Sequence, residues 1–276
     1  MAWHNTPLYH LIIKLKKDAN RMSGIHKTPS FRLDGKRALI PGGATGIGFG
    51  CACALAEAGA EVVISARRQQ NVDEAVSLLQ QEGYHASGLS MDISDIAGTK
   101  AQLHELGAFD IVLNCAGIAR HKPALESDEA EVSQVFDINL KGAYFLMVNA
   151  AQLLIDAGKP GSLITMSSQM GHVSGIDRSV YSATKFGVEG FTKGMAIEWG
   201  AHKIRVNTIA PTFVLTEFTR PTFDRPERAK WILDKIKLGE AALIEDIMGG
   251  AVYLASDASR MVTGTSLLID GGWTAD

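Results

Sequence analysis

The sequence has few cysteines: its 276 residues include only Cys51, Cys53 and Cys115. Three cysteines cannot pair completely, and a chain of this length can bury a core without disulfide bonds. Cys51 and Cys53 stand two positions apart on an expected helix, which favours two small buried residues over a redox or metal-binding pair. We therefore expect a reducing, cytoplasmic location and no metal site.

An excess of charge of one sign is also missing, since 27 basic residues stand against 30 acidic ones, a net charge of −3. This balance argues against nucleic acid as a partner. No apolar run reaches the ~18 residues that a membrane-spanning helix needs, so we expect no membrane partner either. The sequence shows no repeat, low-complexity tract or interdomain linker, which predicts one domain over residues 31–276.

Residues 1–30 differ in composition from the rest of the chain. They carry five lysines and arginines and one aspartate around the short apolar run LIIKL. This run is too short and too interrupted for a secretory signal. We expect a poorly ordered extension, and two alternatives stay open: a basic amphipathic membrane anchor, or a true translation start at Met22.

Short apolar runs alternate with longer helical patterns from Phe31 onward. Helices are expected near 46–58, 71–82, 128–157, 179–199 and 244–256, with another after the third apolar run, and the segment after 210 reads as irregular and charged. The expected strands cover residues 37–40, 61–65, 85–90, 110–114, 162–168, 204–210 and 266–270. This alternation predicts a single Rossmann-like, doubly wound α/β fold: a parallel seven-stranded sheet with helices on both faces.

A glycine-rich turn follows the first expected strand and opens the first helix. Glycine lets the backbone approach a diphosphate, and the helix N-terminus offers free N–H groups and a partial positive charge. Glycine clusters alone are a weak signal, but this position in the first βα unit predicts a dinucleotide site. Its candidate residues are Gly42, Thr45, Gly46, Ile47 and Gly48.

The end of the second expected strand indicates which dinucleotide is bound. A site for NAD(H) wants a carboxylate there for the ribose 2′-hydroxyl, whereas a 2′-phosphate wants a guanidinium. The sequence offers no acid at this point and continues with Arg67 and Arg68. We therefore expect NADP(H) to be favoured over NAD(H), with Arg67 as a contact; the alternative is that both arginines are solvated surface.

Tyr181 and Lys185 stand at i and i+4 in YSATK and share one face of a helix. A nearby ammonium group lowers the pKa of a tyrosine, which is about 10 when unperturbed, and makes it a general acid or base. Such pairs are common on helix surfaces. The interpretation gains weight from Ser168 at the end of the fifth strand, Asn139 in the preceding helix and Asn114 at the end of the fourth strand.

Taken together, these residues resemble the short-chain dehydrogenase/reductase family over nearly all of residues 33–272. The matching positions are Gly42-x3-Gly46-x-Gly48, Asp92, NCAG at 114–117, Asn139, Ser168, YSATK at 181–185, Asn207, Pro211, Thr216 and GTSLLIDGG at 264–272.

The resemblance implies a role for each matching residue. Tyr181 would be the acid/base, Lys185 would lower its pKa and bind the nicotinamide ribose, Ser168 would bind the substrate oxygen, and Asn139 would hold a proton-relaying water. It also implies a homotetramer built through the helices near 128–157 and 180–199. The remaining cofactor-binding residues would be Asp92, Ile93, Asn114, Ala116, Gly117, Pro211, Val214 and Thr216.

Two positions depart from the family pattern. Pro41 replaces the usual threonine before the phosphate-binding glycines and lacks both a hydroxyl and an N–H, so we expect the turn to be braced differently. Thr212 replaces the glycine that usually follows Pro211, which leaves the path of 212–216 open.

The substrate residues are expected after Ser168 and in the loop after the sixth strand. Gln169 and His172 suit a hydroxylated substrate, and Arg220 suits a carboxylate; alternatively, His172 caps a turn. We therefore predict an oxidoreductase that interconverts a secondary alcohol and a ketone or aldehyde in a sugar, polyol or sugar acid. A 3-oxoacyl thioester reductase and, more remotely, a non-catalytic NADP(H)-binding regulator are the alternatives.

Overall fold

The computed structural model describes residues 25–217 and 219–276 and contains one parallel seven-stranded sheet. The strand order is β3-β2-β1-β4-β5-β6-β7, and every neighbouring pair runs parallel. The predicted fold class is thereby confirmed. The strands are Arg37–Pro41 (β1), Glu61–Ala66 (β2), Ala86–Ser90 (β3), Ile111–Asn114 (β4), Gly161–Met166 (β5), Ile204–Pro211 (β6) and Ser266–Ile269 (β7).

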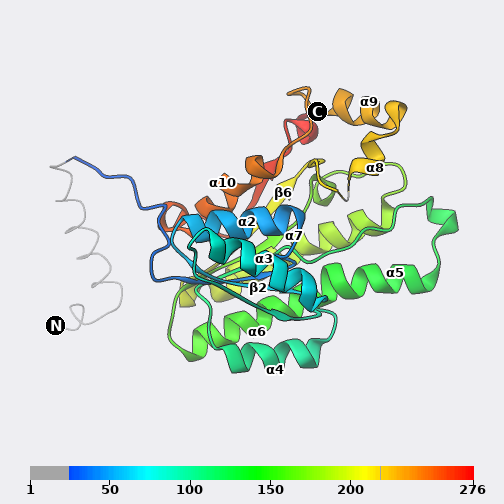
Figure 1. The fold of residues 1–276 in the computed structure, drawn as a ribbon. Coiled ribbons are helices and arrows are strands. Elements are labelled where there is room, and N and C mark those ends of the chain that lie inside the picture. Colours follow the sequence, from blue (N-terminus) through cyan, green and yellow to red (C-terminus); the bar gives the residue numbers. More distant parts are fainter. Residues whose placement is uncertain (1–24, 218) are drawn as a thin grey trace, which may run out of the picture.

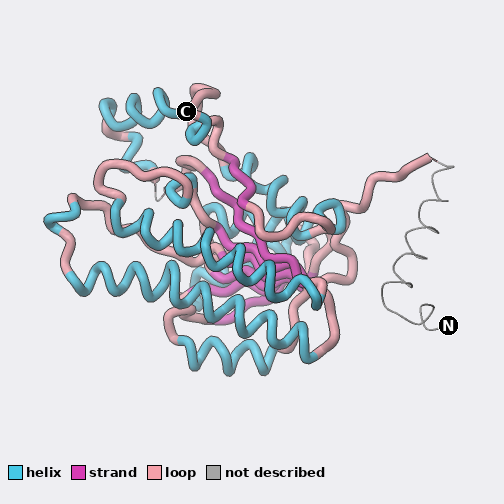
Figure 2. Tube along the Cα trace, turned by 180° about the vertical axis from the view of Figure 1, so that it is seen from behind, coloured by secondary structure: helices cyan, strands magenta, loops and turns pink. Residues whose placement is uncertain are grey.

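Helices cover both faces of the sheet, as the views from the two sides show (Figure 1, Figure 2). One face packs against α2 (Gly46–Glu57), α3 (Gln69–Gln81) and α10 (Ile244–Ala255). The other carries α4 (Ile96–Leu106), α5 (Glu129–Phe136), α6 (Ala143–Asp156) and α7 (Ser179–Trp199). Short 3₁₀ turns occur at Ala124–Glu126 (η1), Gln169–Gly171 (η3), Gly200–His202 (η4), Asp257–Ser259 (η5) and Trp273–Ala275 (η6).

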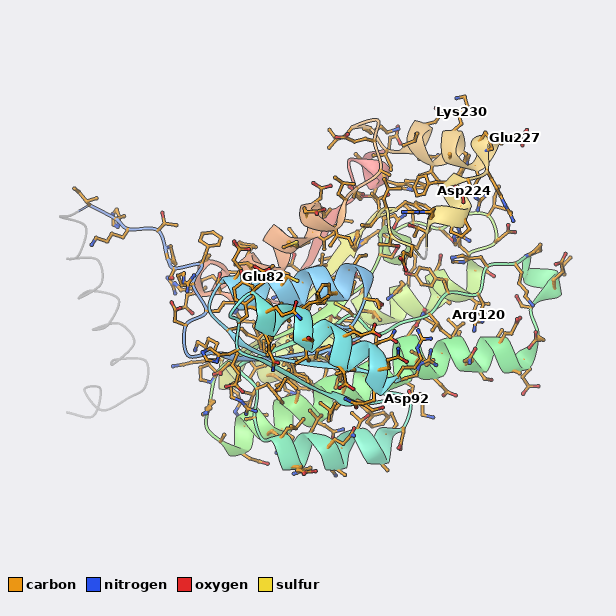
Figure 3. The ribbon with its side chains drawn as sticks, viewed as in Figure 1. Glu82, Asp92, Arg120, Asp224, Glu227 and Lys230 are labelled. Carbon is orange, nitrogen blue, oxygen red and sulfur yellow. The ribbon has the colours of Figure 1, made fainter. Side chains whose placement is uncertain are left out.

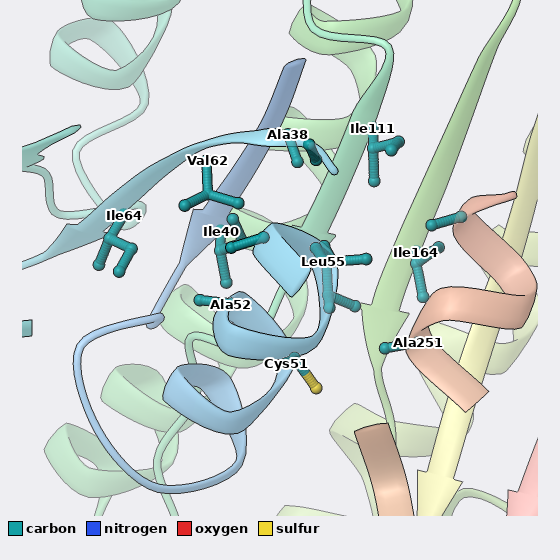
Figure 4. Close-up of a cluster of buried hydrophobic side chains, with 14 of the residues drawn as sticks. Ala38, Ile40, Cys51, Ala52, Leu55, Val62, Ile64, Ile111, Ile164 and Ala251 are labelled. Atoms are coloured by element: carbon teal, nitrogen blue, oxygen red, sulfur yellow. The ribbon is translucent and has the colours of Figure 1, made fainter. Parts of the chain in front are cut away.

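The strands are apolar along their length because both of their faces are buried. In β1, Ile40 joins the cluster under α2, with Leu55 and Ile64 (Figure 4), while Leu39 joins the cluster on the opposite face. A shift of one residue would exchange these two sets, so burial fixes the register. The carboxyl ends of the strands therefore meet at one edge of the sheet.

The expected helix over 128–157 is interrupted in its middle. A π-helical turn, η2 (Asp137–Gly142), separates α5 from α6 and contains Asn139. Such wide turns insert extra backbone into a helix and often occur at functional sites. The whole stretch Glu129–Asp156 is long and apolar enough to cross a membrane, but half of its most apolar window is buried inside the fold, as in a core helix.

The segment after β6 is not irregular as predicted, because it forms α8 (Arg220–Phe223) and α9 (Pro226–Lys235). Each helix has a proline in its first turn, where the missing N–H costs nothing. Ile232 of α9 is fully buried against Met170 and Trp273, which belong to distant parts of the chain. Contacts between distant segments therefore hold a helix that is too short and too charged to be recognised by pattern.

The N-terminal extension that we predicted over residues 1–30 lies mostly outside the described residues. Of that range, residues 25–30 are exposed and form no helix or strand. Among the described residues Leu33 is the first that is buried, and its N–H donates to the carbonyl of Ala58 at the end of α2.

Candidate active site

A cleft with a volume of about 730 Å³ runs along the carboxyl ends of β1, β2, β3, β4, β5 and β6. This volume is typical of sites for small molecules and cofactors. In Figure 3, Asp92 and Arg120 lie at this end of the molecule, below Asp224, which directly follows α8, and Lys230 of α9. The cleft is lined by the predicted residues Gly42, Thr45, Gly46, Ile47, Gly48, Arg67, Asp92, Ile93, Ala116, Gly117, Ser168, Gln169, Tyr181, Lys185, Pro211, Val214 and Thr216.

The glycine-rich turn is built for close approach. Gly42 has a φ of +76°, and a Cβ there would stand 2.5 Å from the backbone nitrogen of Ala116. A Cβ on Gly48 would overlap the carbonyl oxygen of Gly42. The helix α2 begins at Gly46 with no side-chain cap from Thr45, so its first N–H groups stay available. The turn fits the diphosphate of a dinucleotide.

Pro41 is accommodated because neighbouring strands brace the turn. The N–H groups of Gly42 and Gly43 donate to the carbonyl of Ser65 on β2, at 2.7 and 3.3 Å. The carbonyl of Pro41 accepts from the N–H of Cys115 after β4, at 2.7 Å. The different bracing expected at Pro41 is therefore made by the sheet backbone, which needs neither a hydroxyl nor an N–H at that position.

The second departure, Thr212, forms part of the cleft wall. Its N–H donates to the carbonyl of Ile269 at 3.1 Å, which continues the pairing of β6 with β7. Its buried hydroxyl has no hydrogen-bond partner within the described residues. A hydrogen-bonded turn fixes the backbone path of residues 212–216: the Thr219 hydroxyl donates to the carbonyl of Val214 at 2.6 Å.

Arg67 and Arg68 lie where β2 ends, at the outer end of the cleft. Both are exposed, and they line a smaller hollow together with Thr45 and Asn71. Neither guanidinium forms an ion pair with any described residue within 4.0 Å. Two unpaired guanidinium groups beside the phosphate turn fit a phosphate on the adenine ribose.

Asp92 and Asn114 shape the walls of the cofactor end. The Asp92 carboxylate accepts hydrogen bonds from the N–H and the hydroxyl of Ser94, at 3.0 and 2.6 Å. Asn114 is buried and does not line the cleft; its Oδ1 accepts from the N–H of Ala116 at 3.1 Å. Asn114 therefore orders the loop that forms the wall.

Tyr181 and Lys185 lie on the first turns of α7, and both face the cleft. The Lys185 Nζ is 5.5 Å from the centre of the Tyr181 ring and donates to the carbonyl of Met166 at 2.8 Å. Burial lowers the pKa of Lys185 to about 8, although Cys115 and Glu189 act in the opposite direction.

The pKa of Tyr181 is raised from its ordinary value, chiefly by burial. The Ser168 hydroxyl and the charge of Arg178 oppose this rise. The sequence predicted a lowering by Lys185, and this expectation is wrong for the free protein, because loss of solvent around the phenol outweighs the charges nearby. Tyr181 is therefore a protonated phenol near neutral pH.

Ser168 lies two residues beyond β5 and caps η3. Its hydroxyl donates to Oε1 of Gln169 at 2.6 Å and accepts from the N–H of Met170 at 3.2 Å. Gln169 is itself buried and lines the cleft. The pair presents polar atoms beside Tyr181, where a substrate oxygen can bind.

Asn139 connects the helix interruption to the loop after β4. Its Oδ1 accepts from the N–H of Ile118 and its Nδ2 donates to the carbonyl of Ile118, each at 2.8 Å. Asn139 does not line the cleft, but Gly117 does. Gly117 lies close to both side chains, since a Cβ built on it would stand 3.3 Å from the Asn139 Oδ1 and 4.0 Å from the Lys185 Nζ. The amide thus lies just behind the wall that Lys185 faces.

Two residues predicted to bind substrate lie away from the cleft. The His172 Nε2 is 2.9 Å from the Ser266 hydroxyl and 3.6 Å from the Glu189 carboxylate. Arg220 is the first residue of α8 and is exposed. Neither residue lines the cleft, so their roles in substrate binding stay predictions.

The substrate end of the cleft contains two basic residues that the sequence did not single out as ligands. Arg178 is only 6% exposed and stands one helical turn before Tyr181, and His121 packs edge-on against the Tyr181 ring at 5.7 Å. Burial, together with Arg178 and Arg228, lowers the pKa of His121 to about 4. The available signals were the place of Arg178 in the segment after Ser168 and its spacing from Tyr181.

An aromatic cluster closes this end of the molecule. Trp231 of α9 packs edge-on against Trp273 at 5.4 Å, and Phe213 contacts both Trp273 and Phe223. Tyr181 lies at the edge of this cluster. The helices α8 and α9 are therefore anchored by aromatic packing beside the substrate end.

Comparison with known families and proteins identifies several relatives. Residues 42–274 match the family model described as enoyl-(acyl carrier protein) reductase. The chain is 38% identical over 251 residues to 2-dehydro-3-deoxy-D-gluconate 5-dehydrogenase from Dickeya dadantii, covering 89% of this chain and 98% of the relative. It is 36% identical over 241 residues to L-xylulose reductase from Mesocricetus auratus, covering 87% and 97%.

Solved structures show the same similarity. A gluconate 5-dehydrogenase from Burkholderia cenocepacia, in complex with NADP and tartrate, superposes with a TM-score of 0.87 at 33% identity, covering 91% of this chain and all of that chain. A short-chain type dehydrogenase/reductase from Mycobacterium marinum superposes with a TM-score of 0.84 at 36% identity, covering 89% and 98%.

Proposed function

The chain belongs to the short-chain dehydrogenase/reductase family and interconverts a secondary alcohol with a ketone, and we propose that it does so with NADP(H) in preference to NAD(H). The observation that carries the proposal is a single cleft that joins the phosphate turn, the unpaired Arg67 and the Tyr181–Lys185 pair. Relatives that act on sugars and sugar acids support a polyhydroxylated substrate.

The chain's own residues hold the substrate and move the proton, while the nicotinamide, when bound, supplies or accepts the hydride. In ketone reduction, the Ser168 hydroxyl donates to the substrate oxygen, and Tyr181 gives that oxygen its phenolic proton. The Lys185 ammonium then stabilises the phenolate that Tyr181 has become. Alcohol oxidation uses the same groups in reverse, with the Tyr181 phenolate as the base.

Further parts of the site follow from the same proposal. Gly42 to Gly48 and the N-terminus of α2 hold the diphosphate, and Asp92, Ile93, Ala116, Pro211, Val214 and Thr216 complete the cofactor site. Asn139 positions a water that carries protons from Lys185 to solvent. The three cysteines, all free, support a cytoplasmic location.

We also propose a homotetramer assembled through α5–α6 and α7. Large apolar side chains remain exposed on these helices, namely Tyr144, Phe145, Phe186 and Ile197. An exposed apolar surface on adjacent helices is typical of an interface between subunits.

The test of the proposed function is turnover by the purified chain and by its Tyr181→Phe variant. We expect the parent to oxidise NADPH in the presence of at least one keto sugar or keto sugar acid. The variant loses the phenolic proton and should fall about 10²–10⁴-fold in kcat, with unchanged NADPH binding measured by fluorescence. A variant as fast as the parent would contradict this mechanism, and turnover of only 3-oxoacyl thioesters would contradict the substrate class.

A further inference from the structure

Arg178 is a buried cation at the substrate end of the cleft. It directly precedes α7 and follows a tight turn in which Asp177 has a φ of +62°. Its N–H donates to the carbonyl of Gly175 at 3.2 Å, which closes this turn. The side chain is thereby directed into the cleft that Tyr181 and Ser168 also line.

The Arg178 guanidinium forms no close ion pair in the described part of the chain, although the charge of the neighbouring Asp177 acts to raise its pKa. It forms no side-chain hydrogen bond to those residues and no ion pair with their carboxylates within 4.0 Å; burial lowers its pKa to about 10. The acids lining the cleft are Asp92, which is bonded to Ser94 at the cofactor end, and the exposed Glu217. Burying an unpaired charge is costly, so this position is explained by a ligand.

A second cation lies near Arg178. Arg228 of α9 stacks over Trp231 at 4.8 Å, and its charge lowers the pKa of Arg178; His121, with a pKa of about 4, is neutral near neutral pH. A Cβ on Gly175 would stand 3.6 Å from the Arg178 side chain and 3.7 Å from the Trp231 ring, so α9 packs beside Arg178. The substrate end is therefore locally positive although the whole chain has a net charge of −3.

We propose that Arg178 binds the carboxylate of the substrate, so that the natural substrate is a hydroxy or keto sugar acid of the aldonate class and not a neutral ketose or polyol. This assignment rests on the proposed function above. The planar guanidinium offers paired N–H donors that match the two carboxylate oxygens. A neutral sugar would leave the buried cation unpaired, and such a mismatch discriminates strongly between similar ligands.

The test uses matched pairs of probes: 5-keto-D-gluconate with L-sorbose, and 2-keto-D-gluconate with D-fructose. Within each pair the carbon skeleton and configuration agree, and a carboxylate in the acid replaces a hydroxymethyl group. With NADPH, we expect kcat/KM for at least one acid to exceed that of its neutral partner about 100-fold or more. Arg178→Met should lower kcat/KM for that acid about 100-fold, chiefly through KM, and change neutral ketoses less than about 5-fold.

Two further variants make the result specific. Lys230→Met removes an exposed charge from α9 (Figure 3). This variant should leave kcat/KM unchanged for both the acid and its neutral partner. Arg220→Met examines the arginine suggested by the sequence; an acid-specific loss there and not at Arg178 would overturn the assignment. NADPH fluorescence titration of every variant verifies an intact cofactor site.

The outcomes separate this proposal from the function on which it rests. Turnover of neutral ketoses without any preference for the acids overturns the assignment and leaves the oxidoreductase function standing. An equal loss for acids and ketoses in Arg178→Met also overturns it, because the residue then acts on Tyr181 and not on a carboxylate. Failure of the parent to reduce any sugar or sugar acid overturns both.

Discussion

At the scale of single residues, burial decides the chemistry of the proton-transfer pair. It raises the pKa of Tyr181 and lowers that of Lys185, so two groups of ordinarily similar proton affinity move apart and Lys185 becomes the more acidic of the two. Loss of solvent disfavours the charged form of each group, phenolate and ammonium alike. The spacing of YSATK predicts that the two side chains meet, but the sign of each shift depends on the depth of the cleft, which spacing does not reveal.

This pair predicts the pH dependence of ketone reduction. The Lys185 pKa is about 8 in the folded protein against 10.5 ordinarily, so the ammonium is lost as the pH rises through about 8. We expect kcat/KM for reduction to fall tenfold per pH unit above that value, measured between pH 6 and 10 at low NADPH. Tyr181 loses its proton at a higher pH than Lys185, because its pKa is raised from its ordinary value of about 10. A profile flat to pH 10 would contradict the assignment to Lys185.

At the scale of elements, sequence patterns locate the strands well and local irregularities poorly. The ends of β1 and β4 match the prediction within a residue, because burial on both faces leaves a continuous apolar run. The π-turn at Asn139 does not interrupt the apolar pattern, and α9 depends on Trp273 more than forty residues away. The same long-range packing buries Arg178, which is why spacing alone could not identify it.

The end of β2 gives a prediction about cofactor choice. Arg67 is exposed and unpaired beside the phosphate turn, and loss of its guanidinium removes charge-assisted bonds to a 2′-phosphate. Arg67→Ala should raise the KM for NADPH about tenfold and change that for NADH less than twofold. The measurement is a pair of saturation curves with one substrate. Lys159→Ala, a charge change outside the cleft, is the control, and equal effects on both cofactors would contradict the prediction.

At the scale of the whole molecule, the doubly wound sheet brings residues from six strand ends into one cleft, and this arrangement follows from the alternating pattern alone. What the pattern does not provide is the surface left for other subunits. Phe186 and Ile197, three helical turns apart on α7, are 49% and 83% exposed. A helix keeps such residues on one face, so α7 has an exposed edge that carries two large apolar side chains, with the charged Lys193 between them.

This edge predicts the effect of a charge on assembly. Ile197→Asp should convert a tetramer into smaller species, as measured by light scattering coupled to size-exclusion chromatography, because a buried unpaired carboxylate is costly at an interface. Leu78→Asp, at a 53% exposed leucine on α3, is the matched control and should leave the mass unchanged. A parent that elutes as a monomer, or a tetrameric Ile197→Asp, would refute the proposed interface.

The backbone bonds around Pro41 have a thermodynamic consequence. Because Ser65 and Cys115 hold the phosphate turn through the sheet's own hydrogen bonds, the turn has its binding shape before a dinucleotide arrives. The entropy cost of ordering a loop, which flexible sites subtract from their affinity, is then absent at this end of the cleft. The turn therefore stays preorganised although a proline replaces a hydroxyl-bearing residue. On binding, the entropy cost at this end of the cleft comes from the ligand's loss of freedom and not from ordering the protein.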